Sequence, residues 1–148
     1  MKIEGANEIP AAQDTVWAAF LDPATLAKAI PGCEGLEEIG PGEYKAVMKV
    51  GVAAIKGTFE GKVKLMDLEP PNRYRMLVEG KGGPGFVRGE AAMSLTPVDP
   101  STTRVSYDAD VQVGGLIASV GQRMLGGVSK MMLEQFFTRM SELLAEKK

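Results

Sequence analysis

The feature that most constrains the fold is an alternation of apolar and polar residues that begins near Leu36 and continues for about 75 residues. Apolar side chains at every second position indicate β-strands with one buried face and one solvated face. The segment from Val105 to Val113 shows this pattern most clearly. Such alternation is typical of antiparallel sheets, because strands of parallel sheets are usually apolar on both faces. About half of the chain is therefore predicted to form an antiparallel sheet.

Turn signals divide the alternating region into separate strands. They lie at Pro41-Gly42, at Pro70-Pro71-Asn72, in the glycine-rich segment Gly80 to Gly85, and at Pro97 and Pro100. A further strand, Lys2 to Ile9, precedes this region and is closed by Pro10. Because the connections are short, we expect a meander of about seven strands.

Three segments have helical spacing instead. Asp14 to Leu21 predicts a short helix, and Pro23 to about Ile30 predicts a second one with Asp22 as its N-cap. Leu116 to about Ala145 contains no proline and places apolar residues three or four apart, which predicts one amphipathic helix of roughly 30 residues and 45 Å. Only this helix is large enough to cover the apolar face, so the sheet is expected to wrap around it. Its glycines, Gly121, Gly126 and Gly127, are expected to leave room for a strand or a cavity.

Composition limits the chemistry of the chain. Its 148 residues, 45% of them hydrophobic, fit a single domain over residues 1–148. With no histidine and one cysteine, imidazole-based triads, histidine-ligated metals and an internal disulfide are excluded. Cys33 has no activating partner and is interpreted as an inert, buried thiol. We therefore predict no catalytic residue and no metal site.

Charge and hydropathy indicate the environment. A net charge of −2 provides no basic field for nucleic acid. The sequence contains neither the apolar core of a signal peptide at its start nor an apolar run long enough to cross a bilayer, so a cytoplasmic location is expected. Nine methionines, together with the helix glycines and a curved sheet, favour an internal apolar cavity.

Four segments of the sequence resemble the carbon monoxide dehydrogenase CoxG family, which belongs to the START-like (polyketide cyclase-like) helix-grip superfamily. The resemblance covers nearly the whole chain, and it is carried by Ile30 to Glu34, Gly51 to Gly61, Glu79 to Val87, and Gly114 to Ser119 with Gly121 to Arg123. It implies an α+β helix-grip fold, in which a curved antiparallel sheet of about seven strands wraps around a long C-terminal helix and two short helices follow the first strand.

The resemblance also implies an accessory role. Members of this family accompany molybdenum hydroxylases of the carbon monoxide dehydrogenase type, associate them with the cytoplasmic membrane and, in some cases, bind a quinone. Our leading hypothesis is a non-enzymatic protein that binds a lipid or quinone without a covalent cofactor and links such a hydroxylase to the membrane or the quinone pool. Many members extend past the long helix, whereas this sequence ends at Lys148. We therefore expect any membrane contact to be peripheral, at the inner face of the cytoplasmic membrane.

The expected ligand contacts are apolar and aromatic residues of the inner sheet face and of the long helix. We interpret Phe86, beside the turn Gly82-Gly83-Pro84-Gly85, as the gate of a mobile loop. The predicted lining residues are Phe20, Met48, Phe59, Met76, Phe86, Met93, Tyr107, Met124, Val128 and Met131.

Two alternative functions stay open at this point. The same superfamily contains small cyclases, hydrolases and dehydratases, and here Tyr44 and Tyr107 are the hydroxyls expected to point inward. An inward carboxylate beside Tyr107 would favour such an enzyme. The other alternative is a pure interaction module, whose cavity is filled and whose exposed face binds a larger oxidoreductase.

Overall fold

The computed structural model describes residues 1–52 and 55–146. Its seven strands form one antiparallel sheet in the order β1-β7-β6-β5-β4-β3-β2, so each strand from β2 to β7 pairs with the next along the chain. This arrangement confirms the predicted α+β helix-grip architecture with a sheet meander. The strands are β1 (Lys2–Ile9), β2 (Cys33–Gly40), β3 (Glu43–Val52), β4 (Ile55–Glu69), β5 (Arg73–Gly82), β6 (Gly85–Asp99) and β7 (Thr102–Gly114).

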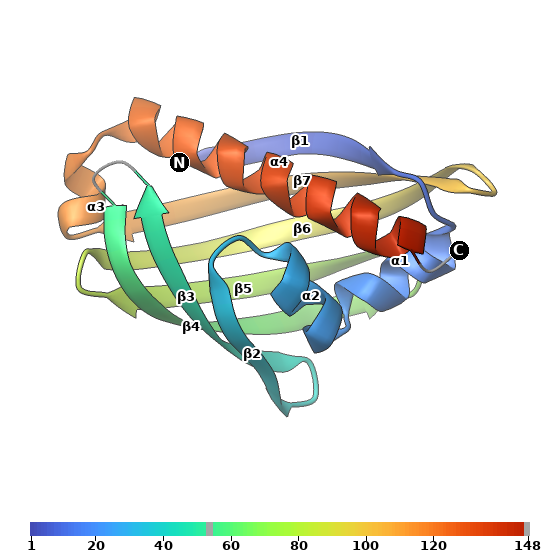
Figure 1. Ribbon diagram of the computed structural model, residues 1–148, viewed down its shortest axis with the longest axis horizontal. Coiled ribbons are helices and arrows are strands. Elements are labelled where there is room, and N and C mark those ends of the chain that lie inside the picture. The colour runs from blue at the N-terminus through green and yellow to red at the C-terminus, as the bar shows by residue number, and fades with distance from the viewer. Residues whose placement is uncertain (53–54, 147–148) are drawn as a thin grey trace.

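The helices lie on one side of the curved sheet (Figure 1). Helices α1 (Gln13–Phe20) and α2 (Pro23–Ala29) follow β1, and α3 (Leu116–Ser119) and α4 (Gln122–Glu146) follow β7. The two short helices lie as predicted, and Asp22 caps α2 by accepting a hydrogen bond from the Thr25 amide at 3.3 Å. Helix α4 runs lengthwise across the concave face of the sheet, and α2 packs against it.

The prediction of one continuous helix from Leu116 to Ala145 is wrong. A break at Val120 and Gly121 separates the four residues of α3 from the 25 residues of α4. Gly121 has a φ of +90°, a left-handed conformation that an α-helix cannot contain and that glycine adopts without strain. Helix α4 therefore extends for about 37 Å rather than 45 Å.

The helix glycines do not make room for a strand or a cavity. Gly126 and Gly127 lie on the exposed side of α4, and a Cβ atom added to either residue would have no atom within 4 Å. The sequence correctly indicates that these glycines are unusual in a helix. It does not show which side of the helix they occupy.

The β5–β6 turn is shorter and better anchored than expected. Gly82 pairs with Gly85, so only Gly83 and Pro84 form the turn. Pro84 is buried, and its carbonyl accepts a hydrogen bond from the Ile117 amide of α3 at 2.9 Å. Gly85 has a φ of +135°, and a Cβ there would collide with the Gly114 carbonyl. These contacts attach the turn to α3 and contradict the prediction of a mobile loop.

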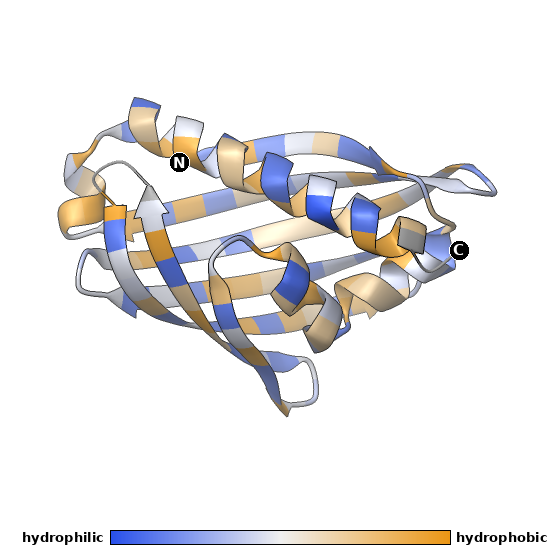
Figure 2. Cartoon of the chain, in the orientation of Figure 1, coloured by the Kyte–Doolittle hydropathy of each residue, from blue (hydrophilic) through white to orange (hydrophobic). Residues whose placement is uncertain are grey.

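Apolar and polar residues alternate along most strands, and the apolar face of the sheet is turned toward α4 (Figure 2). The buried side chains form two clusters. The larger one joins α1, β5, β6, β7 and the C-terminal half of α4 through residues such as Tyr74, Met93, Phe137 and Met140. The smaller one joins the β3–β4 hairpin to α3 and the start of α4, and its buried members are Ile55, Phe59, Ile117 and Leu125.

Candidate ligand-binding cavity

A cavity of about 490 Å³ lies between the concave face of the sheet and α4. Its walls come from all seven strands, from α1 and α2, and from one side of α4. The residues that line it are Ile3, Phe20, Leu26, Ile30, Leu36, Tyr44, Val63, Leu65, Tyr74, Met76, Val78, Ala91, Met93, Tyr107, Ala109, Ser129, Met132, Leu133, Phe136 and Phe137.

The lining is almost entirely apolar. Among its residues there is no carboxylate, amine or guanidinium group. The side-chain groups that can form hydrogen bonds are the hydroxyls of Tyr44, Tyr74, Tyr107 and Ser129. Such a cavity can bind a neutral, apolar molecule, but burying an ion in it would carry a large desolvation cost.

Tyr44 is a structural hydroxyl. Its Oη atom donates a hydrogen bond to the carbonyl of Leu21 at 3.1 Å and thereby ties β3 to the end of α1. Burial raises the pKa of the Tyr44 phenol, and the neighbouring carboxylate of Glu38 adds to this increase. Tyr44 therefore remains a neutral hydrogen-bond donor at physiological pH.

Tyr74, Met93 and Tyr107 form a row across three neighbouring strands. Tyr74 on β5 pairs with Met93 on β6, and Met93 pairs with Tyr107 on β7. The Tyr74 ring meets Trp17 edge to face with 5.5 Å between centroids, whereas the Tyr107 ring stacks on Phe137 of α4 at 5.6 Å. The two phenols are therefore held by different helices at the two sides of Met93.

Four of the predicted lining residues do border the cavity: Phe20, Met76, Met93 and Tyr107. Phe20 comes from α1, and the other three come from neighbouring strands of the sheet. That these residues contact a ligand remains a prediction.

Five other predicted residues lie elsewhere. Met48, Phe59 and Val128 pack in the smaller cluster, which lies beside α3. Met124 is 44% exposed. Met131 lies on the outer side of α4, next to Glu134 and Arg139. Met48 and Phe59 are on the expected face of the sheet, but the smaller cluster fills the space around them.

The structure also corrects the prediction of a gate at Phe86. This side chain lies on the convex face of the sheet, is 42% exposed and does not border the cavity. Its ring covers Gly114 on the neighbouring strand, and the guanidinium of Arg88 lies 5.9 Å from the ring centroid. Phe86 begins β6 in the outward phase of the strand, whereas Val87 is in the inward phase.

Several lining residues were not predicted. Tyr74 shares the inward phase of β5 with Met76 and Val78, so the period of the strand was a signal for it. From α4 come Met132, Leu133, Phe136 and Phe137, which are clustered at helical spacing. The sequence alone does not reveal that this side of α4, rather than the side of Met131, faces the sheet.

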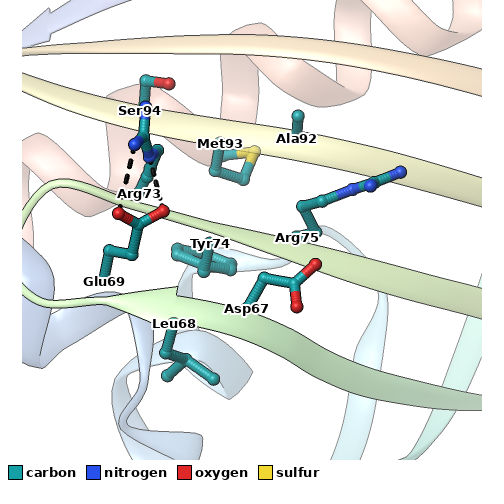
Figure 3. Close-up of a pocket in the computed structure, with 9 residues that line it drawn as sticks. All are labelled: Asp67, Leu68, Glu69, Arg73, Tyr74, Arg75, Ala92, Met93 and Ser94. Atoms are coloured by element: carbon teal, nitrogen blue, oxygen red, sulfur yellow. Dashed lines mark hydrogen bonds and ion pairs between the residues drawn. The ribbon is translucent and has the colours of Figure 1, made fainter.

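A second hollow, on the convex face of the sheet, has a different character (Figure 3). It surrounds a bulge in β4 at Asp67 and Leu68. The guanidinium of Arg73 binds the Glu69 carboxylate through two hydrogen bonds of 2.7 and 3.1 Å. Arg75 on the same face forms an ion pair with Glu90. Because these charged groups neutralise one another, we assign no binding role to this hollow.

The described residues contain no cluster of three or more metal-ligating side chains. Cys33 is half-buried rather than buried as predicted, and its thiol donates to the Gly35 carbonyl at 3.5 Å. None of the helices within residues 1–52 and 55–146 has the length and apolarity needed to cross a membrane.

Comparison with known proteins agrees with the architecture and the cavity. The sequence profile of the carbon monoxide dehydrogenase CoxG family matches residues 5–145. The chain belongs to this family. A conserved protein from Geobacillus kaustophilus of known structure is 40% identical, with a TM-score of 0.95 over 99% of this chain and 96% of that one. No curated protein matches the sequence.

More distant structures share the CoxG fold. A START superfamily protein from Mycobacterium smegmatis is 14% identical, with a TM-score of 0.80 over 99% of both chains. A protein from Chromobacterium violaceum is 19% identical, with a TM-score of 0.72 over 97% of this chain and 96% of that one. At these identities the comparison shows the helix-grip fold alone.

Proposed function

We propose that this CoxG-family chain is an accessory protein that carries a neutral hydrophobic ligand, a quinone or another lipid, in the cavity between the sheet and α4. The observation that carries the proposal is the cavity of about 490 Å³, whose lining has no charged side chain. Membership of the CoxG family supports a partner of the molybdenum hydroxylase type. In this role the chain would link the hydroxylase to the membrane or to the quinone pool.

The volume of the cavity limits the size of the ligand. At about 30 Å³ for each non-hydrogen group, the volume of a water molecule in the liquid, 490 Å³ holds roughly 16 such groups. This number matches a two-ring quinone head with its first isoprene unit, or an acyl chain of similar size. A longer isoprenoid tail would have to extend outside the cavity.

The residues of the cavity favour binding over catalysis. An enzyme of this fold needs an acid–base pair, and an inward carboxylate beside Tyr107 was the feature that would have indicated one. The lining includes no carboxylate, and Tyr44 is engaged with the Leu21 carbonyl. General acid–base catalysis requires a group within hydrogen-bond reach of the proton that is transferred.

The test is extraction of the natively purified protein followed by mass spectrometry, with a pair of matched variants. Ala91 and Ala92 are neighbours on β6, but Ala91 is buried in the cavity wall and Ala92 is exposed on the convex face. Ala91→Phe places a phenyl ring in the ligand space, whereas Ala92→Phe leaves that space unchanged. We expect wild type and A92F to yield a lipid or quinone, and A91F to yield much less.

Circular dichroism establishes that both variants are folded. If extracts of wild-type protein contain no apolar molecule, and an added naphthoquinone does not bind either, the proposal is wrong. Equal ligand content in A91F and A92F would place the ligand outside this cavity and would also refute it.

A further inference from the structure

The hydroxyl of Tyr74 is a polar group whose role the fold does not explain. The side chain of Tyr74 is only 4% exposed and borders the cavity. Among the described residues its Oη atom has no hydrogen-bond partner, in contrast to the Oη atom of Tyr44, which donates to Leu21. Every fully enclosed side-chain nitrogen or oxygen in that part of the chain has a partner. The Tyr74 hydroxyl is therefore not fully enclosed and retains access to open space.

The surroundings of Tyr74 place this space inside the molecule. Tyr74 shares the inward phase of β5 with Met76 and Val78, which line the same cavity. Its ring contacts Trp17 of α1, and its phenol is close enough to Tyr44 for the two groups to interact electrostatically. The hydroxyl thus lies on the concave side of the sheet, toward α1.

The Tyr74 phenol can act only as a neutral hydrogen-bonding group. Burial raises the pKa of this phenol, and the neighbouring Tyr44 has a smaller effect in the same direction. A buried hydroxyl without a partner costs free energy, because it loses its hydrogen bonds to water. A ligand that fills the cavity removes this cost only if it supplies an acceptor.

We infer that the ligand carries a neutral carbonyl oxygen that accepts a hydrogen bond from Tyr74, while the rest of the ligand is apolar. This inference rests on the proposed function and narrows the class of ligand. A carboxylate does not fit, because the lining contains no lysine or arginine to neutralise it. A pure hydrocarbon does not fit either, because it leaves the Tyr74 hydroxyl unpaired. Tyr74 is thus assigned as a specificity-determining residue.

The experiment compares three probes of similar shape: a methylated naphthoquinone, the corresponding methylnaphthalene, and naphthoate. Their dissociation constants for the wild-type chain and for Tyr74→Phe are measured by isothermal titration calorimetry. Quenching of Trp17, the single tryptophan of the chain, reports binding of the quinone near Tyr74. We expect wild type to prefer the quinone over the hydrocarbon by roughly three- to ten-fold, the usual range for one neutral hydrogen bond. Naphthoate should bind more weakly than either.

In Tyr74→Phe the preference for the quinone should disappear, while the affinity for the hydrocarbon is retained. The inference is overturned if Y74F keeps the preference, or if Tyr107→Phe removes it instead. If naphthoate binds most tightly, the ligand class is wrong. If no probe binds, the proposed function itself fails, so the two failures are distinguishable. Should Y74F not fold, infrared spectroscopy of the quinone bound to wild type decides, because a hydrogen-bonded carbonyl stretches at lower frequency and an unshifted band would refute the assignment.

Discussion

Replacing the glycine pair of α4 by alanine should stabilise the protein. Gly126 and Gly127 lie inside a helix of 25 residues, where each glycine costs about 1 kcal/mol relative to alanine. A Cβ atom at either position would meet no atom within 4 Å, so the gain is not offset by a clash. The double variant Gly126→Ala/Gly127→Ala should therefore increase the free energy of unfolding by about 2 kcal/mol. For a chain of this size, this corresponds to a rise in Tm of about 4–8 °C.

Two further glycines separate the effect of space from the effect of backbone conformation. Gly121 also has open space around it, but its φ of +90° strains any other residue, so Gly121→Ala should lower Tm. At Gly61 on β4 the added Cβ would lie 2.9 Å from the Glu79 carbonyl oxygen, so Gly61→Ala should lower Tm through crowding.

Differential scanning calorimetry of the ligand-free protein measures all three variants against wild type. Removal of the ligand matters, because a bound ligand raises Tm by mass action. A Tm for G126A/G127A equal to or below that of wild type would refute the reasoning, since it would mean that the two glycines have a packing role.

Two other perturbations have expected outcomes. Thr103 is fully buried and its hydroxyl donates to the Ala11 carbonyl at 2.8 Å, so Thr103→Val should cost about 1–3 kcal/mol in urea unfolding, and no change in midpoint would argue against this bond. The phenols of Tyr44 and Tyr74 have pKa values raised above 10.0 in the folded chain, so the folded state retains protons that the unfolded state loses. Their contribution to stability is complete below about pH 10 and is lost above it, with a slope of up to about 1.4 kcal/mol per pH unit for each phenol. The slope should be shallower in Tyr74→Phe, and an unchanged slope in that variant would contradict the assignment.

The sheet was predictable because alternation is a local property. In β7 every second residue from Val105 to Val113 is apolar, and this period alone indicates which residues share a face. The start of α2 is similarly local, because Asp22 and Pro23 supply a cap and a first helical residue within two positions. The resemblance to the CoxG family then joined these elements into a helix-grip fold, which the structure confirms.

The candidate site was predicted only in part, because a cavity depends on distances between elements. Phe20, Met76, Met93 and Tyr107 border it, but Met48 and Phe59 have the same inward phase and instead fill the smaller cluster. Their sequence pattern is the same, and only the position along the strand differs.

For α4 the missing information was rotational. Met131 and Met132 are adjacent in the sequence but about 100° apart around the helix, so a small change in phase decides which of them faces the sheet. The break at Gly121 interrupts the continuous phase that the sequence suggested, and the side that faces the sheet is set by packing of the later residues.

The sequence by itself determined which residues form strands, which face of each strand is apolar, and that imidazole chemistry is absent, because these properties depend on near neighbours or on composition alone. Only the tertiary structure decided that the space under α4 stays open and lacks charged groups, and that the Tyr74 hydroxyl has no partner within the described residues while that of Tyr44 has one. The physical reason is that a hydrogen bond or a cavity depends on where distant segments stop relative to one another. Tyr44 reaches the Leu21 carbonyl from a strand 23 residues away, and no local pattern encodes that distance.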